Sequence, residues 1–202
     1  TLDETDLDGV TSISAIIAAD EITALFASPD FGADGAGKVR YHLDADDGAA
    51  TGLWLTDDSN LANEIALVKI NGNSYEGWTG GDTTNGTHAF TISINKFTGA
   101  VTVEQLETLE HLEDGRGAKH DDSLFLTGEA SIAVKQVVFD ADGDRDVAVS
   151  ENALEIEFKD DGPDARAIEG KKAVAGVTLD ETDLDGVTSI SAIIAADEIT
   201  AL

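Results

Sequence analysis

Hydrophobic and polar residues alternate with a period of two over much of the chain, which is the pattern of half-buried β-strands. The segment HAFTISI at residues 88–94 alternates in this way, and so does AVTV at residues 100–103. Between them lies Phe97-Thr98-Gly99, where the glycine suits a tight turn. Together these segments predict a β-hairpin.

Further strand-like runs are short and are separated by turn signals such as Asn71-Gly72 and Asn85-Gly86. The expected strands cover residues 39–43, 52–55, 65–70, 131–139 and 146–158, and an Asp/Gly loop separates the last two. Many short strands with close turns indicate an all-β protein with little helix, built as an antiparallel sandwich or barrel.

Two segments depart from this pattern. In VEQLETLEHL, residues 103–112, an apolar side chain recurs at every third position, which predicts one short helix. Residues 13–25 are compatible with either a strand or a helix.

The first 25 residues, TLDETDLDGVTSISAIIAADEITAL, recur without change at Thr178–Leu202. Twenty-five consecutive identities indicate a tandem duplication with a period of 177 residues. We expect one sandwich over residues 1–163, a linker over 164–177 and the start of the next repeat at 178–202. The first copy then packs against residues 26–163, while the second is frayed or adds a strand to a neighbouring molecule. In the alternative register, residues 26–202 form the domain.

The charge balance narrows the classes of partner that the protein is expected to bind. Lys and Arg number 12 against 41 Asp and Glu, which gives a net charge of −29, while a hydrophobic content of 42% is enough for a core. Such a field repels nucleic acid and anionic lipid and attracts cations, so bound divalent cations are favoured over solubility alone. No stretch reaches the roughly 18 apolar residues of a membrane span, and without cysteine there are no disulfides or thiolate sites.

One loop has the composition of a cation site. Its four carboxylates, Asp140, Asp142, Asp144 and Asp146, alternate around Gly143. Hard cations such as Ca²⁺ take six to eight oxygen ligands, and alternating aspartates let one loop supply several. The loop is not an EF-hand, and the alternative is a solvated acidic hairpin tip.

Two further carboxylate clusters flank the expected linker. A cation between them would stiffen the junction between repeats, whereas without one their repulsion favours a flexible joint. The cluster before the linker is Asp160, Asp161 and Asp164, and the one after it is Asp180, Glu181, Asp183 and Asp185, which repeats Asp3, Glu4, Asp6 and Asp8.

Other motifs carry less chemistry. GADGAGKV at residues 32–39 resembles a phosphate-binding loop, but Val39 replaces the Ser/Thr and a strand follows where a helix must begin. The histidines show no metal-ligand spacing and are expected at the surface, namely His42, His88, His111 and His120. Trp54, Tyr75 and Trp78 are expected in the core or at its rim.

Several short segments, taken in their order along the chain, resemble those of a known protein family. They are LDETD, ADGAGKVRYHL, TGLWLT, HAFTISINKFTGAVTVEQ, HLEDG, FDADGDRD and FKDDGP, which span residues 1–163. This order resembles the tandem-repeat domains that form the extender stalk of giant RTX adhesins, which Gram-negative bacteria export by type I secretion. The resemblance implies Ig-like or cadherin-like β-sandwiches in a calcium-stiffened tandem array. This repeat is longer than expected for the family, chiefly around residues 57–84.

We therefore expect a non-enzymatic extender repeat of a calcium-dependent surface adhesin, which projects a distal ligand-binding domain for attachment and biofilm formation. Identical repeats add length without new chemistry, and each contacts mainly its neighbours. The alternative is a glycan-binding adhesive module that uses Trp54 or Trp78. The third hypothesis is a secreted hydrolase that uses two facing carboxylates.

Overall fold

The computed structural model of the chain describes residues 1–56, 60–111 and 122–161, together with Leu179 and Ser191. All of the described helices and strands belong to one compact unit, Thr1–Gly162. The expected linker at 164–177 lies outside the described residues, and so does almost all of the second copy at 178–202. The predictions about both segments therefore stay predictions.

The described part of the chain is built mainly of short strands. The strands are β1 (Leu2–Asp3), β2 (Ile13–Ile17), β3 (Ala36–Asp44), β4 (Ile65–Asn71), β5 (Ser74–Thr79), β6 (His88–Ile94), β7 (Val101–Gln105), β8 (Ser123–Phe125), β9 (Ala133–Asp140), β10 (Arg145–Val149) and β11 (Glu157–Lys159). The helical segments are α1 (Ala19–Thr23) and three 3₁₀ turns, η1 (Glu4–Leu7), η2 (Leu61–Asn63) and η3 (Gly128–Ala130). No described helix is long and apolar enough to cross a membrane.

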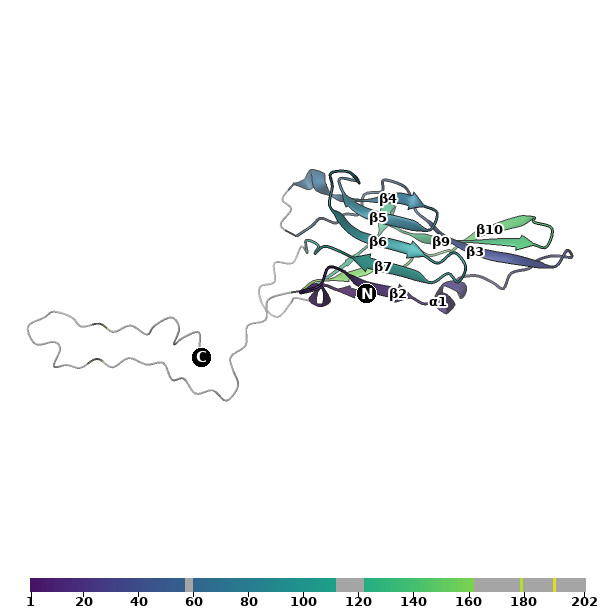
Figure 1. Cartoon of the computed structure of the whole chain (residues 1–202), viewed down its shortest axis with the longest axis horizontal. Coiled ribbons are helices and arrows are strands. Elements are labelled where there is room, and N and C mark those ends of the chain that lie inside the picture. The colour runs from purple at the N-terminus through teal and green to yellow at the C-terminus, as the bar shows by residue number, and fades with distance from the viewer. Residues whose placement is uncertain (57–59, 112–121, 162–178, 180–190, 192–202) are drawn as a thin grey trace, which may run out of the picture. The chain divides into compact units, whose positions relative to one another are not determined.

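The strands form three sheets (Figure 1). A five-stranded sheet has the order β2-β7-β6-β5-β4, and the two three-stranded sheets have the orders β10-β9-β3 and β1-β11-β8. The pairings are antiparallel except for β1 with β11, which are parallel. The fold is therefore an all-β antiparallel sandwich, as the alternating pattern predicted.

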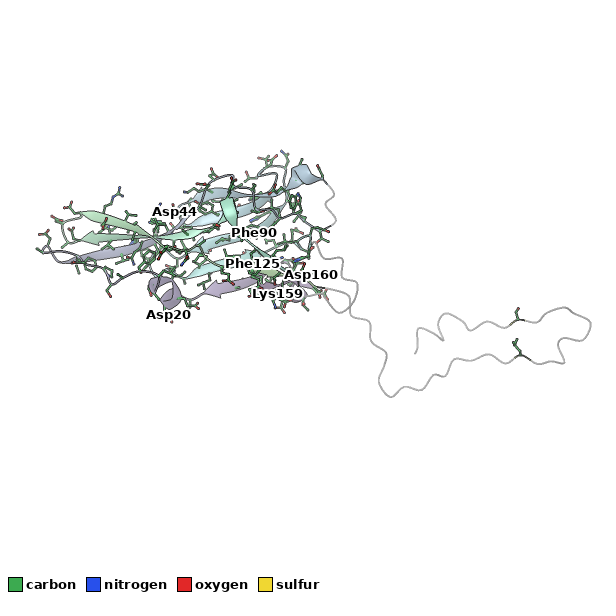
Figure 2. All side chains as sticks on the ribbon, turned by 180° about the vertical axis from the view of Figure 1, so that it is seen from behind. Asp20, Asp44, Phe90, Phe125, Lys159 and Asp160 are labelled. Atoms are coloured by element: carbon green, nitrogen blue, oxygen red, sulfur yellow. The ribbon has the colours of Figure 1, made fainter. Side chains whose placement is uncertain are left out.

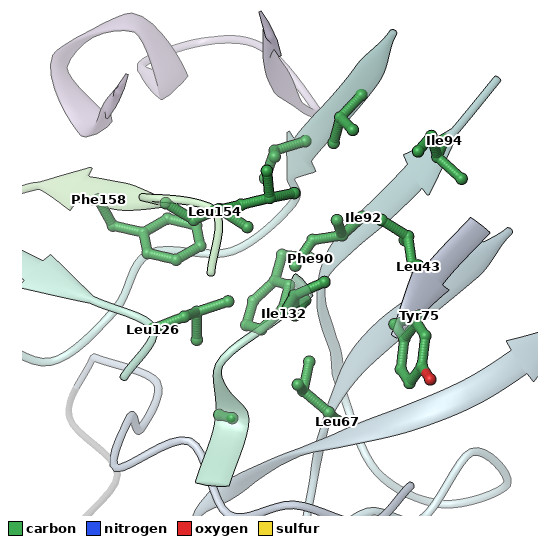
Figure 3. Close-up of a cluster of buried hydrophobic side chains, with 14 of the residues drawn as sticks. Leu43, Leu67, Tyr75, Phe90, Ile92, Ile94, Leu126, Ile132, Leu154 and Phe158 are labelled. Atoms are coloured by element: carbon green, nitrogen blue, oxygen red, sulfur yellow. The ribbon is translucent and has the colours of Figure 1, made fainter. Parts of the chain in front are cut away.

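The core lies between the five-stranded sheet and the strands that face it (Figure 3). Phe90 of β6 and Phe158 of β11 are fully buried, and their ring centroids are 5.3 Å apart. Leu67, Tyr75 and Ile132 from neighbouring segments are also buried in this layer. Burial of this kind is the main source of stability for a sandwich, because each sheet covers the apolar face of the other.

The first copy of the repeat is an integral part of this unit. Its residues form β1, η1, β2 and α1, and β2 pairs with β7 from Ile13 to Ile17. Leu2 and Ile22 are 4% and 1% exposed. The ambiguous segment 13–25 is thus a strand followed by a one-turn helix, which begins where Glu21 accepts a hydrogen bond from the Ala18 amide.

The helix predicted over residues 103–112 is wrong for its described part, 103–111. Strand β7 continues to Gln105, and Leu109 forms an isolated bridge with Leu55. Val103 is buried within a central strand and Leu109 is buried in the segment beyond it, so the apolar stripe is not one face of a helix. Hydrogen bonds to β6 and β2 on both sides override the local preference.

Two other strand predictions differ clearly in extent. Residues 52–55 contribute only the bridge at Leu55, and 146–158 divides into β10 and β11, which belong to different sheets. Strand β5 was missed because Gly77 interrupts its pattern. A Cβ at Gly77 would lie 2.5 Å from the ring of Phe90, so the core requires glycine there. GADGAGKV runs directly into β3, as expected for a strand.

Candidate functional site

The aspartate loop lies between β9 and β10, which form a hairpin that projects at one end of the unit (Figure 1). Carboxylate oxygens of Asp140, Asp142 and Asp34 lie within 4.8 Å of one another. Asp140 ends β9, Asp142 lies in the turn, and Asp34 precedes β3. The loop thus brings together two of the predicted ligands and one carboxylate, Asp34, that was not predicted from the sequence.

Backbone hydrogen bonds fix this geometry. The Asp140 amide donates to the Asp144 carbonyl at 3.1 Å, and Gly143, with φ 102°, donates to Asp140 Oδ1 at 2.9 Å. The Ala141 amide donates to the Gly35 carbonyl at 3.1 Å and so fastens the hairpin to the loop that carries Asp34. The turn is therefore held in place by the chain itself.

Close backbone contact with β3 completes the arrangement. Pairing with β9 is irregular between Ala36 and Lys38, and a Cβ at Gly37 would lie 2.1 Å from the Asp140 carbonyl oxygen. Only glycine allows this approach. The strand pairing explains why Asp34, more than one hundred residues away in sequence, reaches the same loop.

Hydrogen bonds within the turn favour the ionised form of Asp140. The pKa of Asp140 lies below its ordinary value, chiefly because the Asp142 side chain interacts with it, and the amides of Gly143 and Asp144 lower it further against a partial desolvation. A group of three carboxylates suits a hard cation such as Ca²⁺, with backbone carbonyls and water completing six to eight oxygens.

The other two predicted loop carboxylates lie outside this group of three. Asp146 accepts a hydrogen bond from the Val147 amide at 2.9 Å. Asp144 and Asp146 line an adjacent hollow on the surface, together with Asp30 and Phe31. Asp30 was not predicted as part of a site either. Its only signal in the sequence is that of a turn before Gly32, whose amide donates a hydrogen bond to Asp30 Oδ1.

A second group consists of Glu4, His111 and Asp160, whose ligand atoms also lie within 4.8 Å of one another. Glu4 begins η1, His111 lies beyond β7, and Asp160 directly follows β11. Figure 2 shows Asp160 at the end of the described unit that is remote from the β9–β10 hairpin. Pairing of β1 with β11 brings Glu4 and Asp160 together.

Glu4 is deeply buried, with 4% of its side chain exposed. Its Oε1 accepts hydrogen bonds from Gln105 Nε2 at 2.6 Å and from the Leu109 amide at 2.8 Å. The Nε2 atom of His111 is 3.8 Å from the same oxygen. Glu4 therefore links η1 to the segment that follows β7.

His111 corrects a prediction. It was expected at the surface, but only 2% of its side chain is exposed. Burial is the largest influence on its pKa and lowers it, while Glu4, Asp160 and Asp122 act in the opposite sense and leave the pKa above its ordinary value. Burial raises the pKa of Asp160. The fold, rather than any local motif, creates this environment.

The other predicted junction carboxylates have different surroundings. Asp3 caps η1 by accepting from the Thr5 amide, and Asp161 accepts from the Thr5 hydroxyl at 3.4 Å. Asp6 and Asp8 are exposed. Five others lie outside the described residues, namely Asp164, Asp180, Glu181, Asp183 and Asp185.

Of the two tryptophans proposed for glycan binding, Trp78 is partly used within the protein. The Trp78 ring stacks on His88 with centroids 4.6 Å apart and planes 4° from parallel, and its Nε1 donates to Glu76. Tyr75 belongs to the core, as expected, and its hydroxyl donates to the Ala45 carbonyl. Trp78 therefore has one face committed to another ring.

These features define an acidic all-β sandwich domain with two carboxylate-rich groups that can hold cations. A family model described as Domain of unknown function (DUF5801) matches residues 1–152, and the chain belongs to this family. No curated protein and no solved structure matches the chain.

Proposed function

We propose that the chain is a non-enzymatic extender repeat of a calcium-dependent bacterial surface adhesin. The observation that carries this proposal is the use that the fold makes of residues 1–25. They form β1, η1, β2 and α1 of a sandwich, so the same residues at 178–202 are suited to begin another sandwich. Identical units in series provide length, which is the property that a stalk needs.

The strand order is compatible with a head-to-tail array. Leu2 pairs with Phe158, and Asp3 with Lys159, in parallel. A chain that enters along β1 and leaves along β11 therefore keeps one direction through the unit. Neighbouring repeats of the same chain would be the main partners.

Calcium is the proposed cofactor, and the group formed by Asp34, Asp140 and Asp142 is the proposed site. A second calcium at the junction, involving Asp161, Asp164 and the four carboxylates at 180–185, remains part of the proposal from sequence. Low calcium inside the cell would keep the chain loose for type I secretion. External calcium would then stabilise it at the cell surface.

The test compares thermal unfolding in excess EGTA with unfolding in millimolar Ca²⁺. Extracellular modules bind calcium with Kd of roughly 10⁻⁴–10⁻³ M. At about 10 mM Ca²⁺ and the tighter of these Kd values, roughly 10⁻⁴ M, the ion is present at about 100 times its Kd and stabilises the folded state by about 2.7 kcal/mol. For a domain of this size we expect Tm to rise by roughly 5–10 °C.

The matched controls remove two charges each. Asp140→Asn with Asp142→Asn should abolish most of the calcium-induced rise in Tm. Asp46→Asn with Asp47→Asn removes the same charge outside the proposed group and should preserve the rise. An identical Tm in EGTA and in calcium would refute the proposal, and equal losses in both double variants would refute the assignment of the site.

A further inference from the structure

Within the described unit, the group of Glu4, His111 and Asp160 contains buried polar atoms that the protein leaves unsatisfied. Neither ring nitrogen of His111 has a hydrogen-bond partner among the described residues, although its side chain is 2% exposed. Buried polar side chains in folded proteins are nearly always paired, so each exception needs a physical explanation.

The side-chain amide of Gln105, next to Glu4, also has a buried polar atom without a hydrogen-bond partner among the described residues. Gln105 Nε2 donates to Glu4 Oε1 and to the Glu107 carbonyl, which fixes the orientation of the amide. Its Oε1 is therefore an acceptor, and within the described residues it has no donor. Two side chains that contact or approach Glu4 thus carry unused polar atoms.

The distances suit a bridging ion better than a direct bond. His111 Nε2 is 3.8 Å from Glu4 Oε1, which is too long for a hydrogen bond. Two ligands at 2.0–2.1 Å from one tetrahedral Zn²⁺ stand about 3.3 Å apart, so a shift of a few tenths of an ångström would place both on one ion. One ligand atom from each of Asp160, His111 and Glu4 lies within 4.8 Å of the other two.

The charge of the group also favours a cation. Asp122 adds a third carboxylate to the field of Glu4 and Asp160 around His111. A proton on the imidazole is one way to neutralise this field. A divalent ion neutralises more of it and also occupies the lone pair of a neutral imidazole nitrogen.

We infer that Glu4, His111 and Asp160 form a binding site for a transition-metal cation of the Zn²⁺ class. Imidazole nitrogen with carboxylate oxygen is a donor set for zinc and its neighbours, whereas calcium selects oxygen ligands. The same two carboxylates were predicted from the sequence to bind calcium at the junction. The imidazole between them changes the preferred metal.

Such an ion would fasten together three segments that are distant in sequence. Glu4 lies in η1, His111 follows β7, and Asp160 follows the last described strand. The metal would therefore close the unit at the point where the chain leaves it. This inference does not depend on the adhesin assignment, since it rests on the buried group alone.

The experiment uses the whole chain, stripped of metal with a chelator, and titrates Zn²⁺ by calorimetry near neutral pH in a buffer with millimolar Ca²⁺. We expect one zinc ion per chain that calcium does not displace. His111→Gln should weaken zinc binding at least about tenfold, since even changes to residues that support a metal ligand cost 10–100-fold. His42→Gln, in β3 and outside the group, is the matched control and should leave affinity unchanged.

Asp160→Asn provides a second variant in case the buried histidine cannot be replaced without unfolding. It keeps the side-chain shape, removes one proposed ligand charge, and should also weaken zinc binding. Circular dichroism identifies the variants that remain folded. The inference is overturned if the parent chain binds no zinc, if neither folded variant binds zinc more weakly than the parent, or if calcium competes equally for the site.

Discussion

Replacing Ile22 by alanine distinguishes the two copies of the repeated segment most simply. Ile22 lies in α1 and is 1% exposed, and its Cγ2 atom is among the nearest neighbours of the β6–β7 turn at Gly99. The equivalent residue in the second copy is Ile199. Ile22→Ala and Ile199→Ala thus make the same chemical change within the same 25 residues of sequence.

The expected cost follows from the burial of Ile22. The substitution removes three carbon groups, which at about 0.8 kcal/mol each correspond to roughly 2.4 kcal/mol of transfer free energy. The cavity adds to this, and measured Ile→Ala changes in cores cost about 2–5 kcal/mol. Ile22→Ala should therefore lower Tm by roughly 5–15 °C.

The assay is urea denaturation of both variants at fixed calcium, followed by far-UV circular dichroism. We expect Ile22→Ala to lower the unfolding free energy and Ile199→Ala to leave it unchanged, because 25 residues cannot form a core alone. A large loss in Ile199→Ala with none in Ile22→Ala would refute the register, and residues 26–202 would then form the domain.

Two further predictions test the core and the acid response. Gly77→Ala places a methyl group 2.5 Å from the buried Phe90 ring and should cost about 1–3 kcal/mol in urea denaturation, part of which Phe90→Leu should restore in the double variant. No loss in the single variant would contradict this packing. The pKa of Glu157 lies below its ordinary value because the Thr1 and Ser123 hydroxyls donate to it. The contribution of ionised Glu157 to the free energy of unfolding should be complete above its unfolded pKa of about 4.3 and should disappear as pH falls through the lower folded pKa. The difference in unfolding free energy between the parent chain and Glu157→Gln should therefore shrink in acid. A difference that grows in acid would contradict this prediction.

The alternating pattern predicted those parts of the fold in which local and long-range preferences agree. Strand β6 was predicted at residues 88–94, where the structure has it, because its alternate side chains fill one layer of the core. Strand β5 was not predicted, since the need for Gly77 arises from Phe90 in the neighbouring strand. That contact is invisible in the local sequence.

The candidate sites show the same division. Asp140 and Asp142 could be found from their spacing, because one turn carries both. Asp34 reaches them through the pairing of β3 with β9, and His111 reaches Glu4 through the position of β7 beside η1. Sequence spacing reports ligands within a loop, whereas the other ligands depend on which strands become neighbours.

Small-angle scattering tests most directly whether these units form a spacer that calcium stiffens, as proposed. The sample is a chain with two tandem copies of residues 1–177, measured in EGTA and in millimolar Ca²⁺, with circular dichroism to confirm that each domain stays folded. Because calcium replaces repulsion between the junction carboxylates with shared ligands, the maximum dimension should be larger in calcium. Replacing Asp161 and Asp183 by Asn should shorten the calcium-bound form. A maximum dimension that is the same in EGTA and in calcium, with both domains folded, would contradict the account.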